Sequence, residues 1–141
     1  VDPSALTCLY IHQASSRAMS AWRAKLGGTL LITHHGRTEV INAICRLAFI
    51  GYLDDTGLAE ALADFSDAFV NGRLRQADIL WRAALNRATD LSRKHTPRLG
   101  TRSLDVVHVA CAQELKLPRF STLDKRQCSL AKAVGLKLVR I

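Results

Sequence analysis

Several common signatures are missing from this sequence. It has no CxxC pair, no internal repeat, no apolar run of membrane-spanning length and no signal-peptide pattern. The Gly27-Gly28 pair lacks the Lys-Ser/Thr that completes a phosphate-binding loop. The four cysteines are scattered through apolar or helical stretches, which argues against a zinc site and predicts buried free thiols in a reducing cytoplasm. We therefore expect a cytoplasmic protein that does not associate with membranes.

The composition that is present favours a folded, basic protein. The chain has 141 residues, of which 48% are hydrophobic, so a substantial core can form and one domain over residues 1–141 is predicted. The formal net charge is +8, which favours a polyanionic partner such as nucleic acid, an anionic membrane surface or an acidic protein.

Apolar spacing along the chain predicts helices that alternate with short strands. Residues 1–2 look like the end of a strand, followed by a short helix, and residues 96–102 look like a loop. Helices are expected over 15–26, 35–53, 58–72, 77–95, 103–115 and 125–135, and strands over 29–33, 118–122 and 136–141. The helix over 103–115 is apolar on most faces and is expected to be central. This alternation predicts an α/β sandwich with a mainly parallel sheet, whose sites form at the carboxyl ends of strands.

Four of the 12 acidic residues stand out from a solvated surface. Asp2 and Asp124 are expected at strand ends, and Glu39 and Asp105 in the first turns of helices. In a parallel α/β sheet these positions share one side, where uncompensated carboxylates would repel each other. Mg²⁺ or Mn²⁺, which prefer oxygen ligands, would remove the repulsion and could support hydrolysis of a phosphodiester. The alternative is separate structural roles: a helix cap at Asp105, a turn at Asp124 and a buried ion pair at Glu39.

Four segments together resemble the motifs of PIN-domain ribonucleases, and most of all the VapC-type toxins of toxin–antitoxin systems. The resemblance covers essentially the whole chain, and its last two motifs are the most specific. The segments are VDPSALTCLY, ITHHGRTEVINAI, TRSLDVVHVACAQEL and FSTLDKRQCSLAKAVGLKLV.

The resemblance implies a three-layer α/β/α fold and a Mg²⁺- or Mn²⁺-dependent endoribonuclease. It places the acidic quartet on Asp2, Glu39, Asp105 and Asp124. Supporting hydroxyl groups fall on Ser4 and on Thr122, the latter able to orient a carboxylate. It also implies a homodimer and a VapB-like antitoxin that wraps the groove beside residues 35–72.

The sequence departs from the family at its first motif. Few apolar residues precede Asp2, and Pro3 stands where the family more often has Thr. We expect that the first strand begins before Val1, outside the sequence given.

Other residues have weaker claims to a site. Arg98, Arg102, Lys125 and Arg126 flank the acidic positions and are expected to hold RNA phosphates, with solvated charge as the alternative. His108 could be a metal ligand or a packed histidine. The pair at 34–35, both histidines, could contact substrate or serve the loop.

Two other α/β classes with acidic sites do not fit the sequence. A haloacid-dehalogenase phosphatase needs a second Asp where Ser4 stands, and a receiver domain needs a phosphorylated Asp on a third strand, whereas Asp54-Asp55 lies in an interhelical turn. Two alternatives remain open: a non-catalytic RNA- or protein-binding module of the same fold, and a PIN nuclease of RNA processing outside any toxin system.

Overall fold

The computed structural model describes residues 1–139 of the chain and divides them into two compact units. Unit 1 comprises Val1 and Pro3–Ala77, and unit 2 comprises Asp2 and residues 78–139. Each unit is described by itself. The prediction of one domain over the whole chain stays a prediction.

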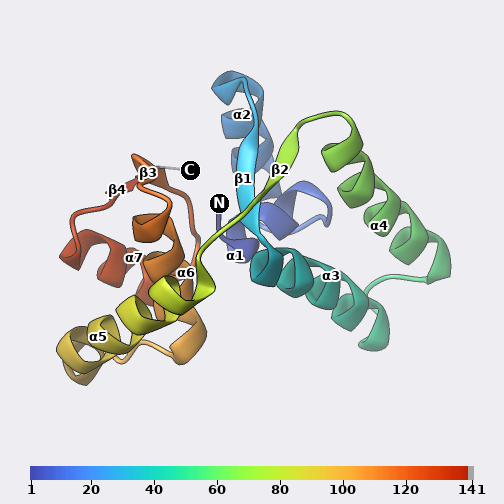
Figure 1. The fold of residues 1–141 in the computed structure, drawn as a ribbon. Helices are drawn as coiled ribbons and strands as arrows, with labels where there is room; N and C mark the ends of the chain where they lie inside the picture. Colours follow the sequence, from blue (N-terminus) through green and yellow to red (C-terminus); the bar gives the residue numbers. More distant parts are fainter. Residues whose placement is uncertain (140–141) are drawn as a thin grey trace. The chain divides into compact units, whose positions relative to one another are not determined.

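Unit 1 begins with helices, and its strands β1 and β2 pair with each other (Figure 1). Its elements, in chain order, are α1 (Pro3–Leu6), the 3-10 helix η1 (Thr7–Leu9), α2 (Ser16–Leu26), β1 (Leu30–Thr33), α3 (His34–Phe49), α4 (Asp55–Val70) and β2 (Leu74–Ala77). The helix starts follow from local capping chemistry. The Thr33 hydroxyl accepts the Gly36 N–H at 3.0 Å, and the Asp54 carboxylate accepts the Gly57 N–H at 2.8 Å.

Strands β1 and β2 pair in parallel, from Leu30 beside Leu74 to Thr33 beside Ala77. The sequence did not predict β2, because two of its four residues are polar and it forms no apolar run. Its stability comes from pairing with β1 and from burial of Leu74 and Ala77 at its two ends. The predicted start of the next helix at residue 77 is therefore wrong, since α5 begins at Trp81.

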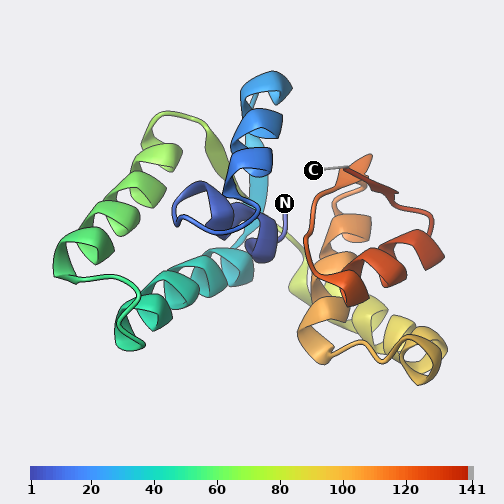
Figure 2. The ribbon, with the colours of Figure 1, turned by 180° about the vertical axis from the view of Figure 1, so that it is seen from behind.

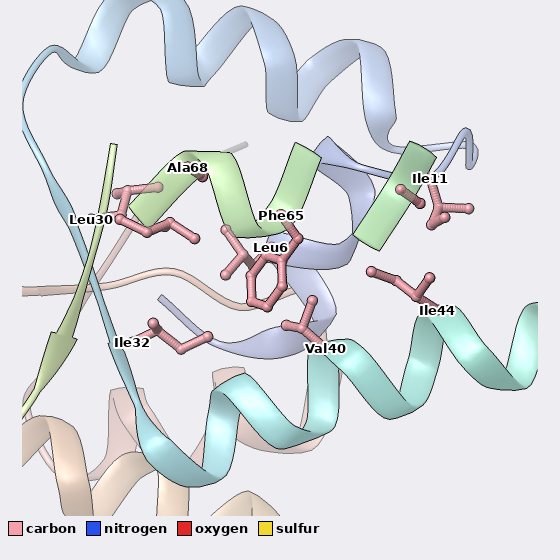
Figure 3. Packing of buried hydrophobic residues seen from close by; sticks show 10 residues of the cluster. Leu6, Ile11, Leu30, Ile32, Val40, Ile44, Phe65 and Ala68 are labelled. Carbon is pink, nitrogen blue, oxygen red and sulfur yellow. The ribbon is translucent and has the colours of Figure 1, made fainter. Parts of the chain in front are cut away.

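The core of unit 1 is built from large apolar side chains. Phe65 of α4 is 1% exposed, and Figure 3 shows it among Leu6 of α1, Val40 of α3 and Ile32 of β1. The Phe65 ring also makes edge-on contacts with Tyr10 and Phe69, at ring-centroid distances of 5.2 and 5.4 Å. Further cluster members are Ile11, Leu30, Ile44, Ala61, Ala68 and Leu74.

Unit 2 consists of packed helices and short paired strands (Figure 2). Its elements are α5 (Trp81–Leu99), α6 (Ser103–Glu114), β3 (Arg119–Phe120), α7 (Lys125–Ala133) and β4 (Lys137–Leu138). Helix α6 packs against both α5 and α7. As predicted, α6 is buried on most of its faces. Its neighbours approach closely because many core residues are small, among them Ala88, Ala110, Ala112 and Ala131.

Helix α5 is longer than the sequence pattern predicted. The predicted loop over 96–102 is wrong for residues 96–99, because α5 continues through Pro97 and ends at Gly100. Gly100 has a φ of 60°, in the left-handed region that glycine adopts readily, and its N–H donates to the Thr96 carbonyl at 2.9 Å. The glycine, and not the proline, ends the helix.

The strands of unit 2 also pair in parallel, Arg119 beside Lys137 and Phe120 beside Leu138. The predicted strand over 136–141 is seen at 137–138, and its last two residues lie outside the described part of the chain. Parallel pairs separated by helices confirm the predicted α/β class. Across residues 1–139, none of the helices is both long and apolar enough to cross a lipid bilayer.

Candidate active site

Asp124 is the N-cap of α7. One of its carboxylate oxygens, Oδ1, accepts the backbone N–H groups of Arg126 at 2.7 Å and Gln127 at 3.0 Å. Its own N–H donates to the Thr122 hydroxyl at 3.1 Å. The expectation that Asp124 ends a strand is wrong, because β3 ends at Phe120. The carboxylate is held instead at the positive end of a helix, where negative charge is stabilised.

Asp105 occupies the first turn of α6, as predicted. Its Oδ2 atom accepts the Arg102 N–H at 2.8 Å, and the residue is 7% exposed. This contact is one half of a capping box, so Asp105 helps to begin the helix. The structural role proposed as an alternative for this residue is therefore real, and it leaves the carboxylate buried beside the other acidic groups of unit 2.

Asp2 is the most deeply buried acidic residue of the site, at 1% exposure. Its N–H donates to the Ser121 carbonyl at 2.8 Å, and its Oδ2 accepts the Thr122 hydroxyl at 3.1 Å. The expectation that Asp2 ends a strand stays a prediction, since that strand was expected to begin before Val1; α1 begins at Pro3. The segment after β3 fixes both the backbone and the carboxylate of Asp2.

Two side chains join the three aspartates into one network. The Thr122 hydroxyl lies between the Asp2 carboxylate and the Asp124 backbone. The Arg126 guanidinium lies between two carboxylates, with Nε 3.1 Å from Oδ2 of Asp105 and Nη2 3.5 Å from Oδ2 of Asp124. Unit 2 therefore gathers Asp2, Asp105 and Asp124 as the sequence predicted.

His108 belongs to the same network. It lies three residues after Asp105 on α6, is 7% exposed, and places Nε2 3.8 Å from Oδ1 of Asp2. The sequence singled out His108 as a metal ligand or a packed histidine but did not identify Asp2 as its neighbour. That contact joins residues more than a hundred positions apart, so no local pattern could have shown it.

The remaining predicted residues of the first two motifs lie in unit 1. Glu39, on α3, has its Oε2 atom 3.5 Å from Nε2 of His35, one helical turn earlier. Ser4 lies on α1, and its carbonyl accepts the Cys8 thiol at 3.5 Å. These local contacts are compatible with the roles that the resemblance implied, which stay predictions.

The basic residues expected to bind RNA all lie in unit 2, and Arg126 is the one whose side chain contacts Asp105 and Asp124 within residues 1–139. Arg98, Arg102 and Lys125 are exposed, in the last turn of α5, at the N-cap of α6 and at the start of α7. Cations at the start of α7 gain nothing from the helix dipole, which favours negative charge there. The positive charges at the start of α7 must therefore be stabilised by other contacts. Arg126 contacts two carboxylates, and Lys125 is exposed to solvent.

The donors in unit 2 suit a hard divalent cation. Carboxylate oxygens are the ligands that Mg²⁺ and Mn²⁺ prefer, and hydroxyl and backbone contacts already orient those of Asp2 and Asp124. Fold and donor set together give an α/β protein with an acidic centre whose donors suit a divalent cation.

The chain belongs to the PIN domain family: the family model matches residues 1–133, and so spans both units. PIN domains are α/β proteins, generally nucleases that use divalent metal ions, and the match therefore supports a PIN-domain nuclease. The parallel strands and high helical content are compatible with the predicted three-layer α/β/α sandwich. A search among curated proteins returned no significant match.

Proposed function

We propose that this PIN-domain protein is a metal-dependent endoribonuclease and the toxin of a VapBC-type toxin–antitoxin pair, acting in the cytoplasm. The observation that carries the nuclease proposal is the network in unit 2 in which Thr122 joins Asp2 to Asp124 and Arg126 joins Asp124 to Asp105. Glu39 of unit 1 is proposed as the fourth acidic residue, from the family resemblance.

In this proposal the chain's own residues prepare the site before any substrate arrives. Asp2, Glu39, Asp105 and Asp124 would hold Mg²⁺ or Mn²⁺. When bound, such a cation supplies Lewis-acid stabilisation of the charge that develops on a scissile phosphate. Thr122 orients Asp2 through its hydroxyl hydrogen and fixes the Asp124 backbone through its hydroxyl oxygen. The N-cap hydrogen bonds of Asp124 use its Oδ1 atom, whereas its Oδ2 atom contacts the Arg126 guanidinium.

The RNA would be held by charge. The chain carries a formal +8, and Arg98, Arg102 and Lys125 present exposed cations in unit 2. Arg102 and Lys125 are near the acidic groups, since the Arg102 N–H binds Asp105 and Lys125 directly follows Asp124. Phosphate contacts of this kind give binding that weakens as the salt concentration rises.

Exposed apolar residues in unit 1 support the proposed protein partners. Phe49 is 89% exposed and Ile50 62% at the end of α3, and Val70 is 83% exposed at the end of α4. Large apolar side chains in such positions commonly contact another protein. They lie within residues 35–72, where the family resemblance implies a VapB-like antitoxin, and we also propose a homodimer.

The test of the nuclease uses two aspartates with the same structural role. Asp124 and Asp54 are both N-caps, of α7 and α4. Because asparagine caps helices about as well as aspartate, Asp124→Asn should keep the cap while removing the charge. We expect RNA cleavage in Mg²⁺ or Mn²⁺ to fall by about 100-fold or more in Asp124→Asn. Cleavage by Asp54→Asn should equal that of the wild type.

Two results would count against this proposal. One is cleavage that continues at full rate in EDTA, and the other is equal cleavage by Asp124→Asn and the wild type. Coexpression in cells distinguishes a toxin from an RNA-processing nuclease, because only a toxin should arrest growth until its antitoxin is supplied.

A second candidate function is a non-catalytic binding module. It is favoured by one observation: Asp105 and Asp124 already serve as helix caps and pair with Arg126, so both have structural reasons to be acidic. A protein that binds RNA tightly, with no cleavage in either metal, would support this module.

A further inference from the structure

Arg126 has an unusual position for a basic residue. It is the second residue of α7, where the helix dipole disfavours positive charge, yet only 37% of its side chain is exposed. Its guanidinium spans two carboxylates from different helices, Asp105 of α6 and the cap of α7, Asp124. Asp105 and Asp124 therefore share one cationic side chain of the protein itself.

The atoms involved show which carboxylate oxygens the Arg126 guanidinium contacts. Oδ1 of Asp124 is occupied by two backbone N–H groups of α7, whereas Oδ2 is the atom that Arg126 contacts, at 3.5 Å. Asp105 uses Oδ2 for both the Arg102 N–H and the Arg126 Nε–H. Within residues 1–139, Oδ2 of Asp124 is bonded by the guanidinium alone, so the oxygen that is not used for capping is held by Arg126.

We propose that Arg126 is a built-in counter-cation that neutralises Asp105 and Asp124 in the metal-free protein and must be displaced by the divalent cation. The inference rests on the proposed function, because it assumes that these carboxylates bind the metal. It adds that one residue of the chain competes with the metal for the same oxygens. Arg126 therefore stabilises the metal-free protein and at the same time lowers its affinity for metal.

The physical argument rests on the cost of gathering like charges. Three partly or fully buried carboxylates in one network repel each other unless a cation lies among them. Without metal, Arg126 is the cation that makes direct contact with two of them. A divalent ion brings twice the charge and can replace it, but each pair broken with the guanidinium reduces the net gain on binding.

The experiment compares Arg126→Gln with Lys125→Gln in the full chain. The two substitutions are adjacent and remove the same charge from the start of α7, but Lys125 is exposed and forms no ion pair among residues 1–139. Binding of Mn²⁺ to the metal-stripped proteins is measured by titration calorimetry, and thermal unfolding is measured with and without saturating Mn²⁺.

We expect Arg126→Gln to bind Mn²⁺ about tenfold more tightly than the wild type, since one charge-assisted contact no longer competes. Without metal, its unfolding midpoint should fall by about 3 °C, and saturating Mn²⁺ should restore most of that loss. Lys125→Gln should change the Mn²⁺ affinity by no more than about twofold, because its charge is solvent-screened. Arg126→Lys, which keeps the charge without the planar fork, should lie between the wild type and Arg126→Gln.

The outcomes separate the inference from the proposed function. Wild-type protein that binds Mn²⁺ and cleaves RNA, with Arg126→Gln binding equally or more weakly, overturns the inference and leaves the nuclease standing. Equal tightening in Arg126→Gln and Lys125→Gln also overturns it, because the effect would then be one of net charge. If neither the wild type nor Arg126→Gln binds Mn²⁺, both the inference and the metal-dependent function are wrong.

Discussion

The two units have cores of different kinds. Unit 1 buries large apolar side chains, among them Phe65, Leu6 and Ile44. Unit 2 buries smaller ones around α6 and adds the charged residues Asp2 and Asp105. The buried polar residues of unit 1 are the neutral Thr7 and Ser16, whose hydroxyl groups donate to nearby backbone carbonyls at 2.8 Å.

This difference separates two sources of stability. Near neutral pH, the stability gained by burying apolar surface changes little with pH, salt or metal. The free energy of a buried carboxylate, in contrast, depends on every charge around it. Unit 1 should therefore respond mainly to changes of volume, and unit 2 mainly to changes of charge and hydrogen bonding. The following changes test that contrast, from the largest expected effect to the smallest.

The largest effect is expected in the core of unit 1. Phe65→Ala removes a 1% exposed aromatic ring and should lower the free energy of unfolding by about 3–5 kcal/mol. Phe49→Ala removes a phenyl ring that is 89% exposed and should change the free energy of unfolding by less than about 0.5 kcal/mol. Urea unfolding followed by circular dichroism measures both.

The contrast between the units adds a second expectation for Phe65→Ala. Its loss of stability should be the same with and without Mn²⁺, because the cavity lies in an apolar cluster. A loss that Mn²⁺ largely restores would show that the core of unit 1 is linked to the acidic site, and the contrast would fail.

A smaller effect on stability, with a larger one on activity, is expected at Thr122. Thr122→Val keeps the shape of the side chain but removes the hydroxyl that binds Asp2 and the Asp124 N–H. We expect a loss of about 1–3 kcal/mol, because buried partners lose their hydrogen bonds, and about a 10–100-fold weaker Mn²⁺ affinity or slower cleavage. Thr122→Ser should recover most of both, whereas an equal defect in Thr122→Ser would assign the effect to packing.

Local patterns in the sequence predicted much of the fold. The apolar faces of α6 and the capping residues near α4 and α7 are encoded within a few positions, so these helices were found to within a few residues. Strand β2 was missed because Arg75 and Gln76 are polar and the strand depends on pairing with β1, more than forty residues earlier. The end of α5 was predicted at residue 95, before a segment that looked like a loop, whereas the helix continues through Pro97 and ends at Gly100.

The site was predictable where its chemistry is local. Asp105 and Asp124 lie at helix starts, and the sequence shows this through their positions before apolar helical spacing. The pairing of Arg126 with Asp105 depends on the packing of α6 against α7, which no local pattern contains. A usable signal was present, since two cations at the start of α7 oppose the helix dipole and require a negative partner.

The smallest effect is expected in the reactivity of two cysteines, one in each unit, which reports the cost of forming a charged thiolate there. All four cysteines are free, as predicted, but the prediction that they are all buried is wrong, because Cys45 is exposed on α3. Cys111 on α6 is buried, and burial, reinforced by the Glu114 carboxylate, raises its pKa from 9.0 to about 11. The thiolate is therefore disfavoured in the folded state.

Iodoacetamide labelling should show this difference, because the thiolate is the reactive form. At pH 8 we expect Cys45 to react first, with Cys111 protected as long as the protein stays folded.

Since the pKa of Cys111 is higher in the folded state, its contribution to stability is complete below pH 9 and is lost between pH 9 and about 11. Its labelling should accelerate over that interval, and mass spectrometry of a Cys45→Ser variant isolates the signal. Equal labelling of Cys45 and Cys111 at pH 8 would contradict the assignment. Protection of Cys111 at pH 8 would agree with the cost of placing a charge on a buried thiol of unit 2, whereas the carboxylate of Asp105 has a backbone N–H and a guanidinium as partners.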